Sequence, residues 1–207
     1  MKIFFYLLIL FTVFCLDKVS SQSDDALQCV IFSERYREYM YAANFMFAKH
    51  WQRAVYTFPL GLIYSIKNGA NFDFKEDDRK GVWIFEPVPD RQNVFYLKNL
   101  RYEEYLYAGD PQRAIFFIVT TNNRNVHTKK EKPVNDETFM WRFEQLNKRG
   151  TYHIFNVKYN EPLFAGGRSH NDDIRRSVLT WYKTPDGSQF YWNVKCKNDK
   201  LLDKNSS

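Results

Sequence analysis

The sequence predicts an all-β fold, because its composition and its internal repeats both favour short strands. Aromatic residues make up 18% of the chain, with 14 Tyr and 19 Phe, and such residues are enriched in strands. Apolar residues alternate with polar ones in short runs, and no helical period lies between these runs. Three marks also recur in the same order along the chain, which predicts three similar structural units.

The first mark reads basic residue, Tyr, any residue, Glu, Tyr or Pro, Met or Leu, aromatic residue, Ala, and it occupies residues 35–44, 101–110 and 158–167. The second mark, an Arg before Ala or Ser, occupies residues 52–55, 112–115 and 175–178. The third mark, a Trp followed two positions later by Phe or Val, occupies residues 83–86, 141–144 and 192–195. Three units are too few for a propeller and too long for a solenoid. Four short strands in each unit instead predict a β-trefoil of three four-stranded repeats, a pseudo-threefold six-stranded barrel whose open end is covered by three hairpins.

The repeats are expected at residues 29–87, 94–144 and 152–196 of one domain at 29–196. The strands of the first repeat are predicted at 29–32, 36–42, 54–58 and 83–85. Those of the second are predicted at 94–99, 105–108, 114–119 and 141–144, and those of the third at 152–157, 163–165, 177–181 and 191–196. Residues 59–80 are interpreted as an inserted loop with an extra short strand, and the polar residues 120–137 as a surface loop.

The two ends of the chain are expected to lie outside this domain. Lys2 precedes an apolar run at 3–16 that is too short to span a bilayer and is followed by small residues, which is typical of a secretory signal peptide. We expect a signal peptide at 1–21, an N-terminal segment at 22–28 and a polar tail at 197–207; a retained N-terminal anchor is the alternative. Asn205 begins an N-glycosylation sequon close to the chain end.

Two cysteines are left once the signal peptide, which contains Cys15, is removed. In an oxidising compartment the isolated pair Cys29 and Cys196 predicts one disulfide, and two thiols are the alternative. The first and last strands of a β-trefoil are neighbours in the barrel. These are the predicted strands that contain Cys29 and Cys196, so the pairing agrees with the fold.

Apolar residues at matching positions of the repeats are predicted to form the core: Met40, Val55, Leu106, Ile115, Leu163 and Val178. The three Trp residues of the third mark are predicted to fill the core as well, with each indole N–H donated to a backbone carbonyl. A role in stacking on a sugar or a cofactor is the alternative for these three residues: Trp83, Trp141 and Trp192.

The candidate ligand-binding residues also recur in each repeat. The turn between the first and second strands contains Tyr36 and Glu38, Tyr102 and Glu104, and Tyr159 and Glu161. Either Glu accepts backbone N–H bonds there while Tyr covers the barrel rim, or carboxylate, hydroxyl and ring form a shallow sugar site. The turn before the third strand contains Arg53, Arg113 and Arg176. Either these guanidinium groups gather at the hairpin cap and bind an anionic group, or each pairs with a nearby acid.

No catalytic or metal-binding pattern is present, so a non-enzymatic protein without cofactor or metal is expected. The histidines show neither HExxH spacing nor a Cys–His pattern, and residues 166–170 do not form a nucleophile elbow. The net charge of +6 favours acidic partners, but the basic residues are interspersed with acidic ones. We expect no specific nucleic-acid binding and no membrane span.

The repeated motifs resemble those of secreted insect β-trefoil proteins, particularly mosquito proteins built from Glu-Tyr-Leu-Tyr-Ala and Arg-Arg-x-Val-x-Thr-Trp units. Residues 175–181 match the second unit best. The sequence is more distantly similar to ricin-B-type lectins and to the trefoil half of moth 30 kDa haemolymph lipoproteins. The resemblance covers residues 29–196 and implies the fold and secretion. Ricin-type lectins have Gln two residues before the repeated Trp, where this chain has Gly81, Phe139 and Phe190.

The sequence therefore predicts a secreted, monomeric protein that resembles a lectin and binds an extracellular glycan or another anionic ligand. One alternative is a protein-directed inhibitor or effector, for example of a protease, that acts through residues 59–80 or 120–137. Another is a haemolymph structural or storage protein.

Overall fold

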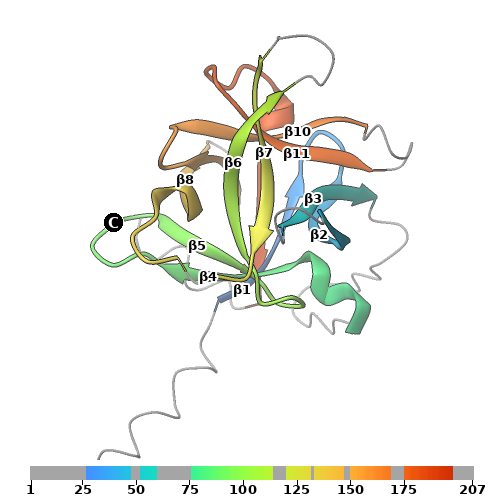
Figure 1. The fold of residues 1–207 in the computed structure, drawn as a ribbon, viewed down its shortest axis with the longest axis vertical. Coiled ribbons are helices and arrows are strands. Elements are labelled where there is room, and N and C mark those ends of the chain that lie inside the picture. The colour runs from blue at the N-terminus through green and yellow to red at the C-terminus, as the bar shows by residue number, and fades with distance from the viewer. Residues whose placement is uncertain are drawn as a thin grey trace, which may run out of the picture.

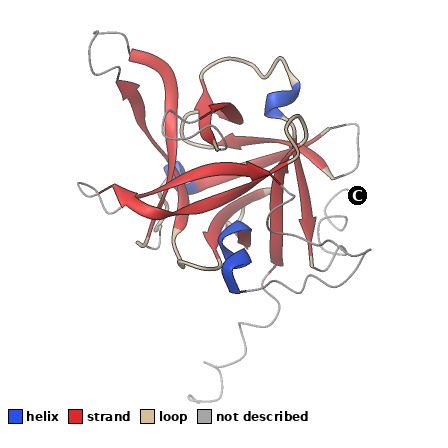
Figure 2. Ribbon diagram, turned by 90° about the vertical axis from the view of Figure 1, so that its right-hand side faces the viewer, coloured by secondary structure: helices blue, strands red, loops and turns tan. Residues whose placement is uncertain are grey.

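The computed structural model describes residues 27–47, 52–59, 76–113, 120–131, 133–146, 150–168 and 175–197. These residues form twelve strands and contain no α-helix, which confirms the all-β prediction (Figures 1 and 2). The strands are β1 (Leu27–Ser33), β2 (Glu38–Phe47), β3 (Gln52–Pro59), β4 (Val82–Pro87), β5 (Val94–Asn99), β6 (Tyr105–Arg113), β7 (Thr120–Lys129), β8 (Met140–Gln145), β9 (Thr151–Asn156), β10 (Glu161–Arg168), β11 (Arg176–Trp181) and β12 (Trp192–Cys196). Three short 3-10 helices are η2 (Glu76–Gly81), η3 (Glu137–Phe139) and η4 (Ser188–Phe190).

Six of the strands close into a barrel. Antiparallel pairing joins β1 to β4, β4 to β5, β5 to β8, β8 to β9, β9 to β12 and β12 back to β1. The seam between β1 and β12 runs in register from Cys29↔Cys196 to Ser33↔Trp192. Closure gives every barrel strand a neighbour on both sides, so this layer has no unpaired edge.

The other six strands form three hairpins. β2 pairs with β3, β6 with β7, and β10 with β11. The second strands of the hairpins also meet one another, because β3 pairs with β7, β7 with β11, and β11 with β3. A closed barrel combined with a triangle of hairpins is the strand arrangement of a β-trefoil.

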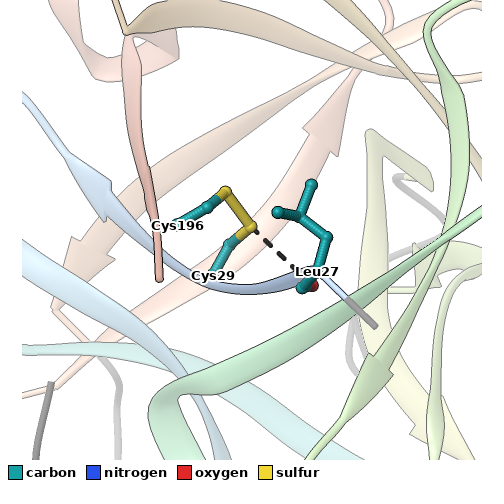
Figure 3. The surroundings of a disulfide bond; sticks show 3 residues. All are labelled: Leu27, Cys29 and Cys196. Carbon is teal, nitrogen blue, oxygen red and sulfur yellow. Dashed lines mark hydrogen bonds between the residues drawn. A yellow bond between two sulfur atoms is a disulfide. The ribbon is translucent and has the colours of Figure 1, made fainter. Parts of the chain in front are cut away.

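A disulfide between Cys29 and Cys196 joins β1 to β12, as predicted (Figure 3). The two residues face each other in the ladder with their Cα atoms 4.0 Å apart, and they are only 1% and 3% exposed. The carbonyl oxygen of Leu27 lies 3.9 Å from Cys29 Sγ. This is a contact and not a hydrogen bond, since a disulfide sulfur has no proton to donate.

Three fully buried Trp side chains link the barrel strands to the hairpins. Each indole Nε1–H donates to the carbonyl of a predicted core residue, in the pairs Trp83–Met40 (3.0 Å), Trp141–Leu106 (3.0 Å) and Trp192–Leu163 (2.9 Å). A buried N–H left unpaired would cost about 1–3 kcal/mol, so these bonds make the indoles compatible with the core. Both the core position and the bonding of the Trp residues were predicted. The other predicted core residues, Val55 and Val178, are also buried, whereas Ile115 lies outside the described residues.

The turn before the first strand of each hairpin (β2, β6 and β10) has the same backbone conformation. Arg37, Glu103 and Asn160 occupy matching positions with φ of 53°, 56° and 52°. In two of these turns an Asn side chain holds the loop: Asn99 Oδ1 accepts from the backbone N–H groups of Arg101 and Tyr102, and Asn156 Oδ1 accepts from that of Tyr159.

One predicted strand was misplaced, and the match between the second repeat and the other two repeats is corrected accordingly. The third strand of this repeat is β7 (Thr120–Lys129), where a surface loop was predicted; residues 114–119 lie outside the described part of the chain. Alternate positions of β7 face the interior, where Val126 is 2% exposed and Thr128 is 0% exposed. The strand tolerates its polar sequence because Arg124 and Thr128 bind buried carboxylates.

The inserted segment at 59–80 is described only in part. Pro59 ends β3 and residues 76–81 form η2, whereas residues 60–75, which include the extra strand expected there, lie outside the described residues.

Candidate functional site

The predicted Tyr, Glu and Arg residues come together where the hairpins meet. Arg53 on β3 donates from Nε and Nη2 to the two carboxylate oxygens of Glu104, at 2.9 and 3.1 Å. Thr128 on β7 donates its hydroxyl to the same carboxylate. The guanidinium carbon of Arg53 lies 3.5 Å from the centre of the Tyr102 ring. Arg53 is therefore held by an ion pair and by the face of an aromatic ring.

Two further clusters repeat this arrangement with the same residue types. The second cluster consists of Arg124, Glu161, Thr180 and Tyr159, with an Arg–Glu distance of 3.0 Å and an Arg–ring distance of 3.6 Å. The third consists of Arg176, Glu38, Thr57 and Tyr36, with corresponding distances of 3.1 and 3.8 Å.

The three clusters connect the repeats of the sequence in a closed cycle. In each cluster Glu, Thr and Tyr come from one repeat and Arg comes from the preceding one, so that Arg176 of the third repeat binds Glu38 of the first. The three Glu residues are only 4–8% exposed: Glu104 (4%), Glu38 (6%) and Glu161 (8%). Their carboxylates accept hydrogen bonds from Arg and Thr side chains. The sequence analysis had instead expected backbone N–H groups as the donors in the structural alternative. The clusters thus join the hairpins, and the ligand-binding role of their residues stays a prediction.

Arg113, which the second mark matched to Arg53 and Arg176, is not their structural equivalent. Arg113 ends β6 opposite Thr120, and Arg124 on β7 occupies the position that Arg53 and Arg176 have in the other repeats. The sequence did contain the signal, because Arg-x-Val-x-Thr is written at 53–57, 124–128 and 176–180. Residues 112–115 begin with the same Gln-Arg-Ala as residues 52–55, and this similarity led to the match with Arg113 instead of Arg124.

A second group of interest is an aromatic surface in the third repeat, which sequence reasoning did not single out as a site. Trp181 ends β11, and its ring lies 5.5 Å from that of Phe164 on β10 and 5.5 Å from that of Tyr182. Phe164 also packs on Phe190 of η4, which is 2% exposed. Tyr182 is 47% exposed and Trp181 is half-buried. We call Phe164, Trp181 and Tyr182 the Trp181 surface.

The other two repeats have different residues at the position of Trp181. That position follows the Thr of each cluster and is Phe58 in the first repeat and Lys129 in the second. The Phe58 ring packs against Tyr41 at 6.0 Å, and the Lys129 ammonium lies 5.0 Å from the centre of the Tyr107 ring. Among the described residues, an exposed Tyr with a Trp beside it therefore occurs only in the third repeat.

A shallow depression of about 440 Å³ lies beside the loop between β4 and β5, from Pro87 to Phe95. Its Arg91 forms an ion pair with Glu137 at 2.8 Å. The positive charge of Arg91 is therefore already balanced by Glu137.

Several ionisable groups have shifted pKa values because they are buried. Burial raises the pKa of Tyr39 to about 12, and burial together with the Glu86 carboxylate raises the pKa of Tyr105 to about 12. Burial lowers the pKa of His153. Within the described ranges, no three His, Cys, Asp or Glu residues are grouped so that they could hold a metal ion. None of the helices in those ranges has the length and apolar character needed to cross a membrane. Asn205 lies outside the described residues.

No protein-family model and no curated protein matches this sequence. Solved structures do resemble it. A salivary protein of Culex quinquefasciatus from the Cysteine and Tryptophan-Rich family has a TM-score of 0.56 and 15% identity, over 84% of this chain and 97% of that one. The designed threefold-symmetric protein ThreeFoil has a TM-score of 0.55 and 11% identity, over 81% and 96%. A ricin B-like lectin of Macrolepiota procera, solved with lactose, has a TM-score of 0.53 and 13% identity, over 84% and 99%.

At these identities the likeness shows the fold alone, and it supports the assignment as a β-trefoil. It also agrees with the predicted resemblance to mosquito trefoil proteins and ricin-B-type lectins at the level of the fold. The resemblance to the moth lipoproteins stays a prediction.

Proposed function

We propose that this protein is a secreted, non-enzymatic β-trefoil of three four-stranded repeats that binds an extracellular glycan. The observation that carries the proposal is the Trp181 surface, in which Trp181 and the 47% exposed Tyr182 lie side by side next to Phe164. The C–H face of a pyranose ring is apolar and packs on aromatic rings. Neighbouring exposed aromatic groups of this kind are typical of ligand-binding surfaces.

The electrostatics of this surface are compatible with a neutral or an acidic glycan. The Lys183 ammonium lies 5.3 Å from the centre of the Tyr182 ring and adds a positive charge beside the aromatic pair. The net charge of +6 also attracts acidic glycans, over a longer range than Lys183 does. The structural similarity to the Macrolepiota lectin solved with lactose adds support from the fold.

The Arg–Glu–Thr clusters have a supporting role in this proposal. Thr180, which directly precedes Trp181, donates its hydroxyl to the buried carboxylate of Glu161. Arg176 at the start of the same strand binds Glu38. Both bonds fix β11 and thereby hold Trp181 in one orientation, which reduces the entropy lost when a ligand binds.

A protein-directed inhibitor has less support. One of the two loops assigned to that activity spans residues 120–137, and its first ten residues form strand β7, which pairs with β6, β3 and β11.

The experiment is a glycan-array screen of the mature chain at low and high salt, with two variants. Tyr182→Ala removes half of the exposed aromatic pair, and we expect it to weaken binding about tenfold or more. Val134→Ala is the matched control, because Val134 is 84% exposed on a different loop. Equal binding by Tyr182→Ala and the wild type, or no bound glycan at low salt, would contradict the proposal.

A further inference from the structure

A buried polar atom lies next to Trp181 and has no hydrogen-bond partner among the described residues. Asn123 on β7 is directly opposite Trp181 on β11 in the antiparallel ladder. Directly opposed residues project from the same face of a sheet, with Cβ atoms about 5 Å apart. The side-chain oxygen of Asn123 is buried, and no group in the described part of the chain donates a hydrogen bond to it. A buried acceptor without a donor is unfavourable, which points to a donor that binds from outside the chain.

We propose that Asn123 is a specificity-determining residue of the glycan site. Its Oδ1 accepts a hydrogen bond from a hydroxyl or amide N–H group of a sugar whose C–H face packs on Trp181. The inference rests on the proposed function and names the ligand class more narrowly: a pyranose with a hydrogen-bond donor at the edge of its apolar face. The oxygen is covered in this structure, so the amide rotates about the Cβ–Cγ bond to meet the ligand. This terminal torsion has a broad energy profile, so the rotation is easily made.

The site is shared between two repeats, with Trp181 from the third and Asn123 from the second. The equivalent position before the cluster Arg is Gln52 in the first repeat and Arg175 in the third. Continuing the printed registers by one residue pairs Lys129 with Gln52, and Phe58 with Arg175, so neither junction has a Trp at the position of Trp181. Arg175 lies 5.5 Å from the Tyr56 ring, which places a charge where the junction at Trp181 has the Asn123 acceptor. We infer one glycan site of this kind in the described part of the chain.

The test is isothermal titration of the mature chain with lactose, N-acetyllactosamine and a sulfated N-acetyllactosamine, together with any glycan that the array identifies. Asn123→Leu keeps the size of the side chain but removes the acceptor, and we expect binding about tenfold weaker. Asn123→Asp keeps an acceptor oxygen, and affinity for the neutral sugars should stay within about threefold of the wild type. Asn125→Leu is the matched control, because Asn125 is two residues away on the same face, opposite Leu179.

A deoxy sugar that lacks the donor hydroxyl separates a direct contact from a structural effect. It should bind the wild type more weakly than the parent sugar does, whereas Asn123→Leu should bind both equally, because the bond is already absent. The stoichiometry should be one sugar per chain. If Asn123→Leu binds as the wild type does while Tyr182→Ala loses binding, the role of Asn123 is wrong and the glycan site stands. If no glycan binds, both proposals fall.

Discussion

Arg176 on β11 binds Glu38 on β2 across 138 positions of the sequence, and this ion pair completes a cycle with Arg53–Glu104 and Arg124–Glu161. The barrel closes where β1 meets β12, and the hairpins close where β11 meets β3. The structure is therefore closed twice, once by backbone pairing and a disulfide and once by buried side-chain ion pairs. The two closures suggest where substitutions should have the largest effects.

Removing one carboxylate from the cycle should destabilise the fold. Glu104→Gln should lower the free energy of unfolding by about 3 kcal/mol, because the Arg53 side chain is only 9% exposed and would lose its counter-charge. The neighbouring Glu103, with a side chain 75% exposed, is the matched control, and Glu103→Gln should change stability by less than about 0.5 kcal/mol. Urea unfolding followed by circular dichroism measures both. Similar losses in the two variants would refute a special role for the buried pair.

Within the described residues, the first repeat lacks a hydrogen bond that the other two have. Asn99 Nδ2 donates to the carbonyl of Lys80 at 2.8 Å, and Asn156 Nδ2 donates to that of Thr138 at 2.8 Å. Ser33 occupies the matching position, and its buried hydroxyl has no partner in the described part of the chain.

Ser33→Asn should supply this missing bond. The N–H of Glu34 already donates to the carbonyl of Tyr191, as the N–H after Asn99 does to that of Val82, so the backbone acceptors are in the equivalent place. We expect a gain of about 1 kcal/mol in the free energy of unfolding. The reverse substitution, Asn99→Ser, should lower it by a similar amount. Thermal unfolding measures both changes, and a lower midpoint for Ser33→Asn would show that the first turn differs from the others.

The disulfide should contribute strongly to stability, because it closes a loop with a sequence separation of 167. The chain-entropy model gives about 5 kcal/mol for a loop of this length. Replacing both Cys29 and Cys196 with Ser should lower the unfolding midpoint, and a reducing agent should lower that of the wild type but leave that of the double variant unchanged. A wild-type midpoint insensitive to reduction would contradict this.

His153 should make the protein less stable at mildly acidic pH. Burial lowers its pKa below the ordinary value of 6.5, although Glu144 opposes the shift. The ring packs against Tyr191 at 5.4 Å and Phe155 at 6.1 Å. The folded state takes up the proton less readily than the unfolded state does. This contribution is therefore complete above pH 6.5 and is lost as the pH falls from 6.5 through the lowered pKa.

The comparison of the wild type with His153→Phe tests this pH dependence. Urea midpoints measured from about pH 5.5 to 7.5 should fall with decreasing pH in the wild type and change less in the variant, because few other groups titrate in that window. Parallel curves would assign the pH dependence to other groups.

The features predicted correctly from the sequence are those in which the residue type at a single position is enough to indicate where the side chain lies. The core position of the Trp residues, and the donation of each indole N–H to a backbone carbonyl, were predicted because every repeat has the same large side chain at the same point. The disulfide followed from the same reasoning, since only two cysteines remain in the predicted mature chain.

The misplaced strand and the wrong Arg both lie where the surroundings of a residue depend on contacts between strands. Strand β7 resembles a surface loop because its polar residues pair with Glu residues of two different turns, and these contacts leave no local trace in the sequence. The pairing of Asn123 with Trp181 likewise depends on the register between β7 and β11. Only the recurrence of Arg-x-Val-x-Thr could have located that register in advance.

The central claim, that a glycan binds at Trp181, is tested most directly by the indole N–H signals in a ¹H–¹⁵N spectrum of the mature chain during titration with an array-positive glycan. The signal that disappears in Trp181→Phe should shift as the glycan is added. The signals of Trp83, Trp141 and Trp192, whose N–H groups are bonded in the core, should stay in place. A glycan that binds without moving the Trp181 signal would contradict the account.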